Sequence, residues 1–299
     1  MMIAAITGTN LLTFLITGLT VGGIYALSAL GLVVVYRATG VLNFAQGAVG
    51  AIAALTLANE FIGKGRPEAL GYIAAVALAI VLSLFYGLVI SPRLSRRDPI
   101  VRAMGALGFG LFILGFCGWR WTARIQKLDL PTDEWSFKIG EVTVTLTRAL
   151  VIVLALVVTV AITAFLNKTR VGLSMRSLAN DRELSSMLGV DVRRAETVAW
   201  LMGGVIAGLS GILFGATKQL DASSLTFLVI PAIAAAVVGQ LKSLWWTFAG
   251  AMLIGVIEAE LTNFNRISPY KDITQLAVGA GVILLLQRSR VVSFVGADR

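Results

Sequence analysis

The chemistry open to this sequence is limited, because the chain contains no histidine and a single cysteine, Cys117. A histidine base, a Cys/His metal site and an intramolecular disulfide are therefore excluded. The sequence also lacks a Gly-x4-Gly-Lys-Ser/Thr phosphate-binding loop, so we do not predict that this chain hydrolyses ATP. We expect neither a metal nor a cofactor.

Polar side chains inside the first two uncharged stretches are candidates for contact with a solute, since polar groups inside a membrane are costly. Asn43 and Gln46 follow Gly40, where a helix can break. A helix that restarts there can direct unpaired N–H groups at an anionic carboxylate. The alternative role is hydrogen bonding between helices. The full set of candidates for a substrate path is Thr20, Gly22, Gly23, Tyr25, Ser28, Asn43, Gln46 and Gly47.

A second group of residues, in the loop 168–196, predicts a short capped helix. Asn180 is a favourable N-cap, Glu183 lies three residues later as in a capping box, and Gly189 is suited to end the helix. Asp191 can cap a following helix that continues into the next apolar stretch. One face of the short helix would carry Leu184, Met187 and Leu188. Such a helix packs on the protein's own helix ends or inserts into a groove of a partner, and the residues alone favour neither.

The elements that must position these residues are membrane-spanning helices. Of the 299 residues, 57% are apolar and 14% are charged, whereas soluble domains have about 25% charged residues. A span needs about 20 mostly apolar residues, and most of the uncharged stretches reach that length. We therefore predict an all-α polytopic transmembrane bundle of eight to nine spanning helices, with residues 1–299 forming a single domain. The uncharged stretches are 1–36, 38–59, 69–92, 103–119, 149–167, 197–217, 222–241, 243–257 and 273–287.

The first uncharged stretch is predicted to be one long helix, or a helix followed by a re-entrant turn at Gly22-Gly23. It is not expected to be a cleaved signal peptide, because it lacks a basic start and its apolar run is too long. The connection 120–148 contains alternating β-branched residues around Ile139-Gly140, which predicts a small hairpin in an external loop. Glycines 204, 208, 211 and 215 form a small-residue helix face that favours close packing.

The net charge of +9 has a topological explanation. With nine alternating spans, one set of connections holds 15 basic and 6 acidic residues and the other holds 10 of each, which accounts for all charges in the chain. The positive-inside rule places the first set in the cytoplasm. We therefore expect the N-terminus outside and the C-terminus inside, and we expect no nucleic-acid partner.

Two widely separated blocks of sequence carry a family resemblance. In residues 172–191, Glu183-Leu184-Ser185 is followed by Gly189, and an earlier block contains Gly18 to Tyr36 and then Gly40 to Gly47. These blocks resemble the cytoplasmic coupling loop and the N-terminal signature of branched-chain amino-acid (Liv-type) permeases of ABC importers. In the coupling loop, Glu183-Leu184-Ser185 falls where that family has Glu-Ala-Ala.

The resemblance implies a membrane permease that does no covalent chemistry. It would transport branched-chain amino acids, or similar small carboxylates or amides, across a bacterial inner membrane. The implied partners are a second permease subunit, two cytoplasmic ATP-binding subunits, a solute-binding protein and membrane lipid. The residues that the resemblance assigns to ATPase coupling are Arg176, Leu178, Ala179, Asn180, Glu183, Leu184, Met187, Leu188 and Gly189.

Other functions remain open from the sequence. One is an ABC permease for another small solute, such as urea, an aromatic acid or a sugar. Another is an ion-coupled secondary transporter, which usually has a carboxylate within a span, whereas 1–36, 38–59 and 197–217 have none. A membrane enzyme is the third. The basic residues Arg176, Arg182, Arg193 and Arg194 either pair with acidic groups of an ATPase or contact lipid headgroups.

Overall fold

The computed structural model describes residues 8–262 except 96, 122–127, 129, 134, 140–141 and 219, together with residues 277 and 281. This part of the chain is an all-α bundle with one small hairpin, in which β1 (Ser136–Ile139) pairs antiparallel with β2 (Val142–Thr145), as predicted. The α-helices are α1 (Gly8–Thr39), α2 (Gln46–Thr56), α3 (Glu68–Phe85), α4 (Ser91–Leu94), α5 (Pro99–Arg120), α6 (Leu146–Lys168), α7 (Arg170–Asn180), α8 (Arg182–Met187), α9 (Val192–Thr217), α10 (Ala222–Phe227), α11 (Val229–Val238) and α12 (Leu244–Thr262).

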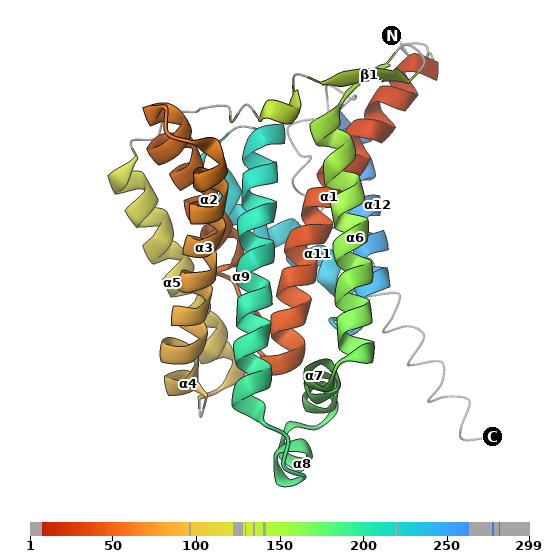
Figure 1. The fold of residues 1–299 in the computed structure, drawn as a ribbon. Coiled ribbons are helices and arrows are strands. Elements are labelled where there is room, and N and C mark those ends of the chain that lie inside the picture. Colours follow the sequence, from red (N-terminus) through yellow and green to blue (C-terminus); the bar gives the residue numbers. More distant parts are fainter. Residues whose placement is uncertain are drawn as a thin grey trace, which may run out of the picture.

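Six helical segments of the described chain are long and apolar enough to cross a membrane. They run side by side along the vertical axis of Figure 1. The first stretch is one continuous helix, so the alternative of a re-entrant turn at Gly22-Gly23 is wrong. The six segments are Thr13–Thr39, Glu68–Leu94, Pro99–Arg120, Leu146–Lys168, Val192–Thr217 and Leu244–Leu261. The expected count of eight to nine full spans is therefore not reached among the described residues.

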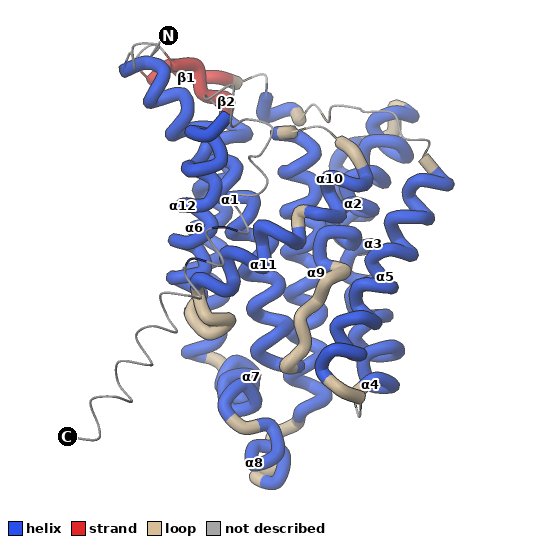
Figure 2. Tube along the Cα trace, turned by 180° about the vertical axis from the view of Figure 1, so that it is seen from behind, coloured by secondary structure: helices blue, strands red, loops and turns tan. Residues whose placement is uncertain are grey.

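The uncharged stretch 38–59 does not form a full span. The last residue of α1 is Thr39. Gly40 follows with a φ of +69°, in the left-handed region that favours glycine, and the helix stops there. The chain then leads upward without helical structure to α2 (Figure 2). α2 has 11 residues, about 16 Å at 1.5 Å per residue, against a hydrocarbon core of about 30 Å. A π-helical turn, Leu57–Phe61, extends it.

The stretch 222–241 is also interrupted. It forms α10 and α11, which have 6 and 10 residues, with a break at Leu228. Pro231 lies in the first turn of α11, where its missing N–H costs no helical hydrogen bond. A continuous helix would place Pro231 in its interior, so the restart at Val229 accommodates the proline. The last predicted span, 273–287, lies outside the described residues, apart from 277 and 281.

α1 is the central helix of the bundle. In the most apolar part of its span, 89% of the residues are buried, whereas the corresponding parts of α3, α5 and α6 are 28% buried or less. It packs against α6, α9, α11 and α12. α3, α5 and α6 expose most of their apolar residues, which is the arrangement expected where lipid covers the outside. Changes at the surface of α1 therefore affect several neighbours at once.

Glycines let α1 and α12 approach closely. A Cβ atom added at Gly255 would lie 2.3 Å from the backbone nitrogen of Gly22 and 2.4 Å from the carbonyl oxygen of Gly18. The glycine face of α9 has the same role: Gly204 and Gly208 lie against α3, and a Cβ at Gly211 would meet the carbonyl oxygen of Gly50 at 2.2 Å. These glycines pack helices without the hydrophobic driving force available in water.

We expect Gly255→Ala to lower the free energy of unfolding by about 1–3 kcal/mol, because α1 and α12 must separate to admit the methyl group. The matched control is Gly108→Ala in α5, where nothing lies within 4 Å of the added Cβ. Thermal unfolding of both variants in detergent measures the difference. Equal melting temperatures would show that the α1–α12 contact is not as tight as described.

Candidate functional site

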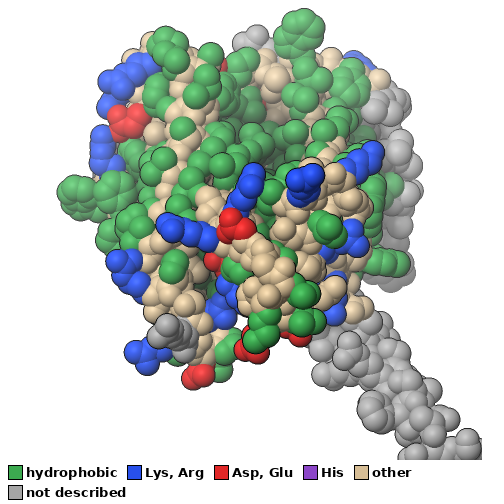
Figure 3. All heavy atoms as spheres, turned by 60° about the horizontal axis from the view of Figure 1, so that its bottom comes forward, with side chains coloured by type: hydrophobic (Ala, Val, Ile, Leu, Met, Phe, Trp, Pro, Cys, Tyr) green, Lys and Arg blue, Asp and Glu red, His purple; other side chains and the backbone are tan. Residues whose placement is uncertain are grey.

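α7 and α8 form the lower end of the molecule in Figure 1. α7 packs against α1 and α6, and its Met175 and Leu178 are buried. Thr169 caps α7, since its side chain accepts a hydrogen bond from Gly172 N–H (3.0 Å). α8 projects below α7 in both Figure 1 and Figure 2. Seen from this end, Lys and Arg side chains are spread over the surface and hydrophobic side chains come forward among them (Figure 3).

The N-terminus of α8 is capped by Asp181, not by Asn180 as predicted. The Asp181 side chain accepts a hydrogen bond from Leu184 N–H (2.9 Å), while Asn180 is the last residue of α7. Glu183 is consequently the second helical residue rather than the third, so the expected capping box is wrong by one position. The carboxylate of Glu183 still lies in the first turn, where it interacts favourably with the helix dipole.

The C-terminus of α8 ends at Gly189, as predicted. Gly189 has φ +83°, and its N–H donates to the Ser186 carbonyl (3.1 Å). Val190 N–H donates to the Ser185 carbonyl (3.1 Å). These paired bonds are a Schellman motif, which satisfies carbonyls left free at the helix end. Asp191 then caps α9 by accepting from Arg194 N–H (2.9 Å), also as predicted.

The apolar face of α8 is exposed. The exposed fractions are 55% for Leu184, 83% for Met187 and 76% for Leu188. These side chains do not pack on the ends of the protein's own helices, which was one of the two predicted roles. Exposed apolar side chains on a capped helix are typical of a surface that another protein covers. Among the neighbouring predicted residues, all in α7, Ala179 and Asn180 are exposed and Leu178 is buried.

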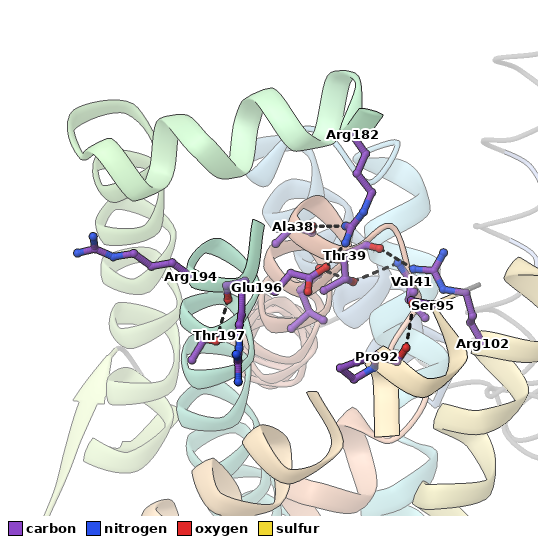
Figure 4. Close-up of polar contacts among 12 residues, drawn as sticks. Ala38, Thr39, Val41, Pro92, Ser95, Arg102, Arg182, Arg194, Glu196 and Thr197 are labelled. Carbon is purple, nitrogen blue, oxygen red and sulfur yellow. Dashed lines mark hydrogen bonds and ion pairs between the residues drawn. The ribbon is translucent and has the colours of Figure 1, made fainter. Parts of the chain in front are cut away.

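Arg182, the first residue of α8, contacts the end of α1. Its Nη1 donates to the carbonyl of Ala38 (3.2 Å), and its Nη2 pairs with Glu196 of α9. Figure 4 shows the Arg182 side chain reaching from α8 toward Ala38. By contrast, Arg176 of α7 donates to Asn167 Oδ1 (2.9 Å) and does not take part in this cluster. One arginine thus joins α8 to both α1 and α9.

The last carbonyls of α1 accept hydrogen bonds from several elements. Gly40 N–H donates to the Tyr36 carbonyl (2.7 Å), and Thr39 Oγ1 donates to the Val35 carbonyl (2.8 Å). Arg102 of α5 donates to the Thr39 carbonyl (2.8 Å; Figure 4). The positive charge of an arginine at a helix C-terminus also interacts favourably with the negative end of the helix dipole. The point where α1 ends is therefore held by α5 and α8 together.

Asn43 and Gln46, two of the predicted path residues, bond to each other and to α9. Asn43 Nδ2 donates to Gln46 Oε1 (3.2 Å), and Gln46 Nε2 donates to the Gly203 carbonyl (3.1 Å). Ala45 N–H donates to Asn43 Oδ1 (3.1 Å), which supports the restart of the helix at α2. Gly47 lies against α10, where an added Cβ would be 2.1 Å from the Thr226 carbonyl oxygen.

The path candidates on α1 lie in the bundle interior. Thr20 is buried, and its hydroxyl donates to the Ile16 carbonyl (2.8 Å). Gly22 and Gly23 pack against α12 and α6. Ser28 is fully buried, and its hydroxyl has no hydrogen-bond partner in the described structure. Gln46 lies against α1 at Gly31, three residues after Ser28.

Tyr25, the remaining candidate on α1, belongs to a buried cluster that the sequence did not predict. Its hydroxyl donates to Glu258 Oε2 (2.7 Å), and Lys218 donates to Glu258 Oε1 (3.0 Å). Glu258 is not among the substrate-path candidates predicted from the sequence. In the structure it is 4% exposed. The sequence feature that could have indicated this cluster is an acidic residue, Glu258, near the end of an apolar helix.

The comparison with known proteins agrees with this arrangement. Residues 14–286 match the family described as the branched-chain amino acid transport system permease component. The chain belongs to this permease family. The permease is 26% identical to LivH of Salmonella typhimurium, a high-affinity branched-chain amino acid transport system permease protein, over 90% of this chain and 91% of LivH. It is 28% identical to BraD of Pseudomonas aeruginosa, described in the same terms, over 92% of each chain.

A solved structure shares the fold of the permease. It is that of PsaBC from Streptococcus pneumoniae in complex with Fab, with a TM-score of 0.50 and 10% sequence identity, covering 91% of this chain and 90% of the matched chain. At that identity the likeness concerns the fold alone. The family match and these relatives, rather than the shared fold, identify the permease as a multi-pass membrane subunit of an ABC importer, and α8 lies in its predicted coupling loop.

We expect Asp181→Ala to destabilise α8 by about 1 kcal/mol, because Leu184 N–H loses its acceptor. Amide hydrogen exchange at Leu184 should become about fivefold faster. Asn180→Ala is the matched control, since the adjacent residue does not cap α8. If the two variants accelerated exchange equally, Asp181 would not be the N-cap.

Proposed function

We propose that the permease forms the translocation path of an ATP-driven importer for branched-chain amino acids. The observation that carries this proposal is that the capped helix α8 exposes its apolar face at the lower end of the bundle, in a chain that belongs to the permease family. Two cytoplasmic ATPase subunits would hydrolyse the ATP, and this chain would need no cofactor. A second permease subunit and an external solute-binding protein would complete the complex.

The proposed orientation in a bacterial cytoplasmic membrane follows from the basic residues. The lower ends of the helices in Figure 1 carry α4, α7 and α8. Four arginines lie in 91–102, and the loop 168–196 holds six basic and four acidic residues. The positive-inside rule puts this end in the cytoplasm. The N-terminus then lies outside and the C-terminus inside, and the hairpin β1–β2 covers the external face.

In the proposed mechanism, α8 acts as a rigid element between the ATPase and the bundle. Its caps keep it helical although it has only 6 residues, a length at which an isolated helix is not stable. A displacement of α8 reaches α9 through Asp191 and Glu196, and reaches α1 through Arg182. The Arg182–Glu196 pair is partly exposed, so its role is to fix positions rather than to add stability.

The proposed path passes the interrupted segment between α1 and α2. Non-helical backbone at membrane depth is tolerated where protein or a water-filled cavity surrounds it, and transporters bind solutes at such discontinuous helices. The Asn43–Gln46–Gly203 bonds connect this segment to α9. A movement of α9 would therefore act directly on the start of α2.

Reconstituted with its partner subunits in liposomes, the permease should take up L-leucine with ATP and not with an ion gradient alone.

Met187→Ser together with Leu188→Ser should abolish uptake and should prevent recovery of the ATPase with the permease, because burying each of these side chains in the interface contributes about 1.5–3 kcal/mol. Leu173→Ser on α7, 63% exposed, is the control and should retain both. Uptake driven by an ion gradient without the ATPase would refute the proposal.

Arg182→Met should leave the ATPase bound but reduce uptake about two- to thirtyfold, the range for changes within a coupling network. Arg194→Met is the matched control. Arg194 lies in the first turn of α9, the helix whose Glu196 pairs with Arg182, and in Figure 4 its side chain points away from Arg182 and Ala38. Uptake and ATPase recovery are measured side by side. Equal uptake by the two variants would remove Arg182 from the coupling route.

A further inference from the structure

Two arginines without an acidic partner lie where α1, α6 and α7 meet at the lower end of the bundle. Arg37 is in the last turn of α1, and Arg176 is in the middle of α7. α7 packs against both α1 and α6. The Arg176 side chain donates to Asn167 Oδ1 near the end of α6 (2.9 Å), so it reaches across from α7 to α6. The junction of these three helices therefore holds both guanidinium groups.

The charge of Arg37 is not balanced within the described part of the chain. Its side chain is half-buried and forms no ion pair there. The charged group that acts on it is Arg176, another cation, so the two guanidinium groups repel each other. A partly buried charge without a counter-ion is unfavourable, and a like charge beside it adds to the cost. An anion that contacted both groups would remove this cost.

The two other arginines near the end of α1 do have partners. Arg182 pairs with Glu196. Arg102 donates to the carbonyl of Thr39 and is attracted by Glu196 as well. The unbalanced charge is therefore a property of Arg37 and its neighbour on α7, and not of this end of the bundle as a whole.

The helices at the junction offer no carboxylate that could balance the charge. α1, α6 and α7 contain no aspartate or glutamate. Asp181, the first residue after α7, is already engaged as the N-cap of α8. Between α6 and α7, the exposed residues Lys168 and Arg170 add two further positive charges. The anion therefore has to come from outside these helices.

The depth of the junction matches that of lipid headgroups. Arg37 lies in the last turn of the span Thr13–Thr39, directly after Tyr36, a residue type that is common at membrane–water interfaces. α6 exposes most of its apolar residues, as a lipid-facing helix does, and α7 lies below it in Figure 1. The apolar face that the ATPase would cover is on α8, which projects farther down. The junction is thus at the level of lipid phosphates.

We propose that Arg37 and Arg176 form a binding site for the phosphate group of an anionic phospholipid such as phosphatidylglycerol. A guanidinium group donates two parallel hydrogen bonds to a phosphate. The phosphate would accept from both arginines, so that a shared anion replaces their repulsion. Basic pockets between spanning helices on the cytoplasmic side are the kind of site that holds anionic headgroups. A zwitterionic lipid also carries a cation, which this junction repels.

The bound lipid would fix α7 to the end of α1. α8 begins directly after Asp181, which follows the last residue of α7. A lipid that holds α7 in place therefore also holds the base of the helix that would contact the ATPase. The site does not depend on which solute the permease transports.

Thermal unfolding of the purified transporter complex in detergent tests this site with three probes. They are dioctanoyl-phosphatidylglycerol, dioctanoyl-phosphatidylcholine and inorganic phosphate. Phosphatidylglycerol should raise the melting temperature in a saturable way. In Arg37→Gln with Arg176→Gln its half-saturating concentration should rise roughly tenfold or more, because two charged donors are lost. Phosphatidylcholine should not distinguish this variant from the unmodified complex.

Arg193→Gln with Arg194→Gln is the matched control, because it removes two exposed charges from the first turn of α9 at the same end of the bundle. It should respond like the unmodified complex. If the Arg37 variant does not fold, Arg176→Gln alone, at an exposed position, carries the same measurement. An equal loss of response in both double variants, or no loss in either, would overturn the site. Inorganic phosphate acting at the same concentration as the lipid would overturn the lipid as its ligand.

Discussion

The constraint on which this structure depends is that backbone N–H and C=O groups inside a membrane must find partners within the protein. Full-length helices meet it by themselves, and six of them enclose the described bundle. The interruption after Gly40 needs additional donors and acceptors. Arg102, Arg182 and the Asn43–Gln46 pair supply them. Within the irregular segment Val41, Asn43 and Ala45 are buried in protein. This segment also lies where the coupling elements converge.

The contacts of Arg182 and Lys218 follow one design in different parts of the molecule. In each case a basic side chain outside a long helix binds an acceptor that belongs to the central bundle. Arg182 is partly exposed and binds a helix end, where its charge complements the dipole. Lys218 binds a carboxylate shielded from water. The first contact joins α8 to α1, and the second joins the end of α9 to α12.

The sequence predicted the bundle, the hairpin, the short helix α8, its end at Gly189 and the cap at Asp191, because each depends on local residue types. It predicted the break at Gly40, but not that α2 falls short of a full span and not the break at Leu228, since a lack of charge does not distinguish a continuous helix from an interrupted one. The N-cap was misplaced by one residue because Asn180 and Asp181 are adjacent and both suit the position. The bond from Arg182 to Ala38 joins a side chain to a backbone carbonyl 144 residues away in sequence, and the residue type at position 38 does not influence it.

The exposed face of α8 has a consequence for the life of the protein before assembly. Until another protein covers Leu184, Met187 and Leu188, these side chains face water on a helix held in shape by its caps. Quality-control proteases and chaperones recognise such surfaces, so a permease made in excess of its partners should be removed from the cell. The face that would contact the ATPase would then also distinguish assembled permease from permease without its partners.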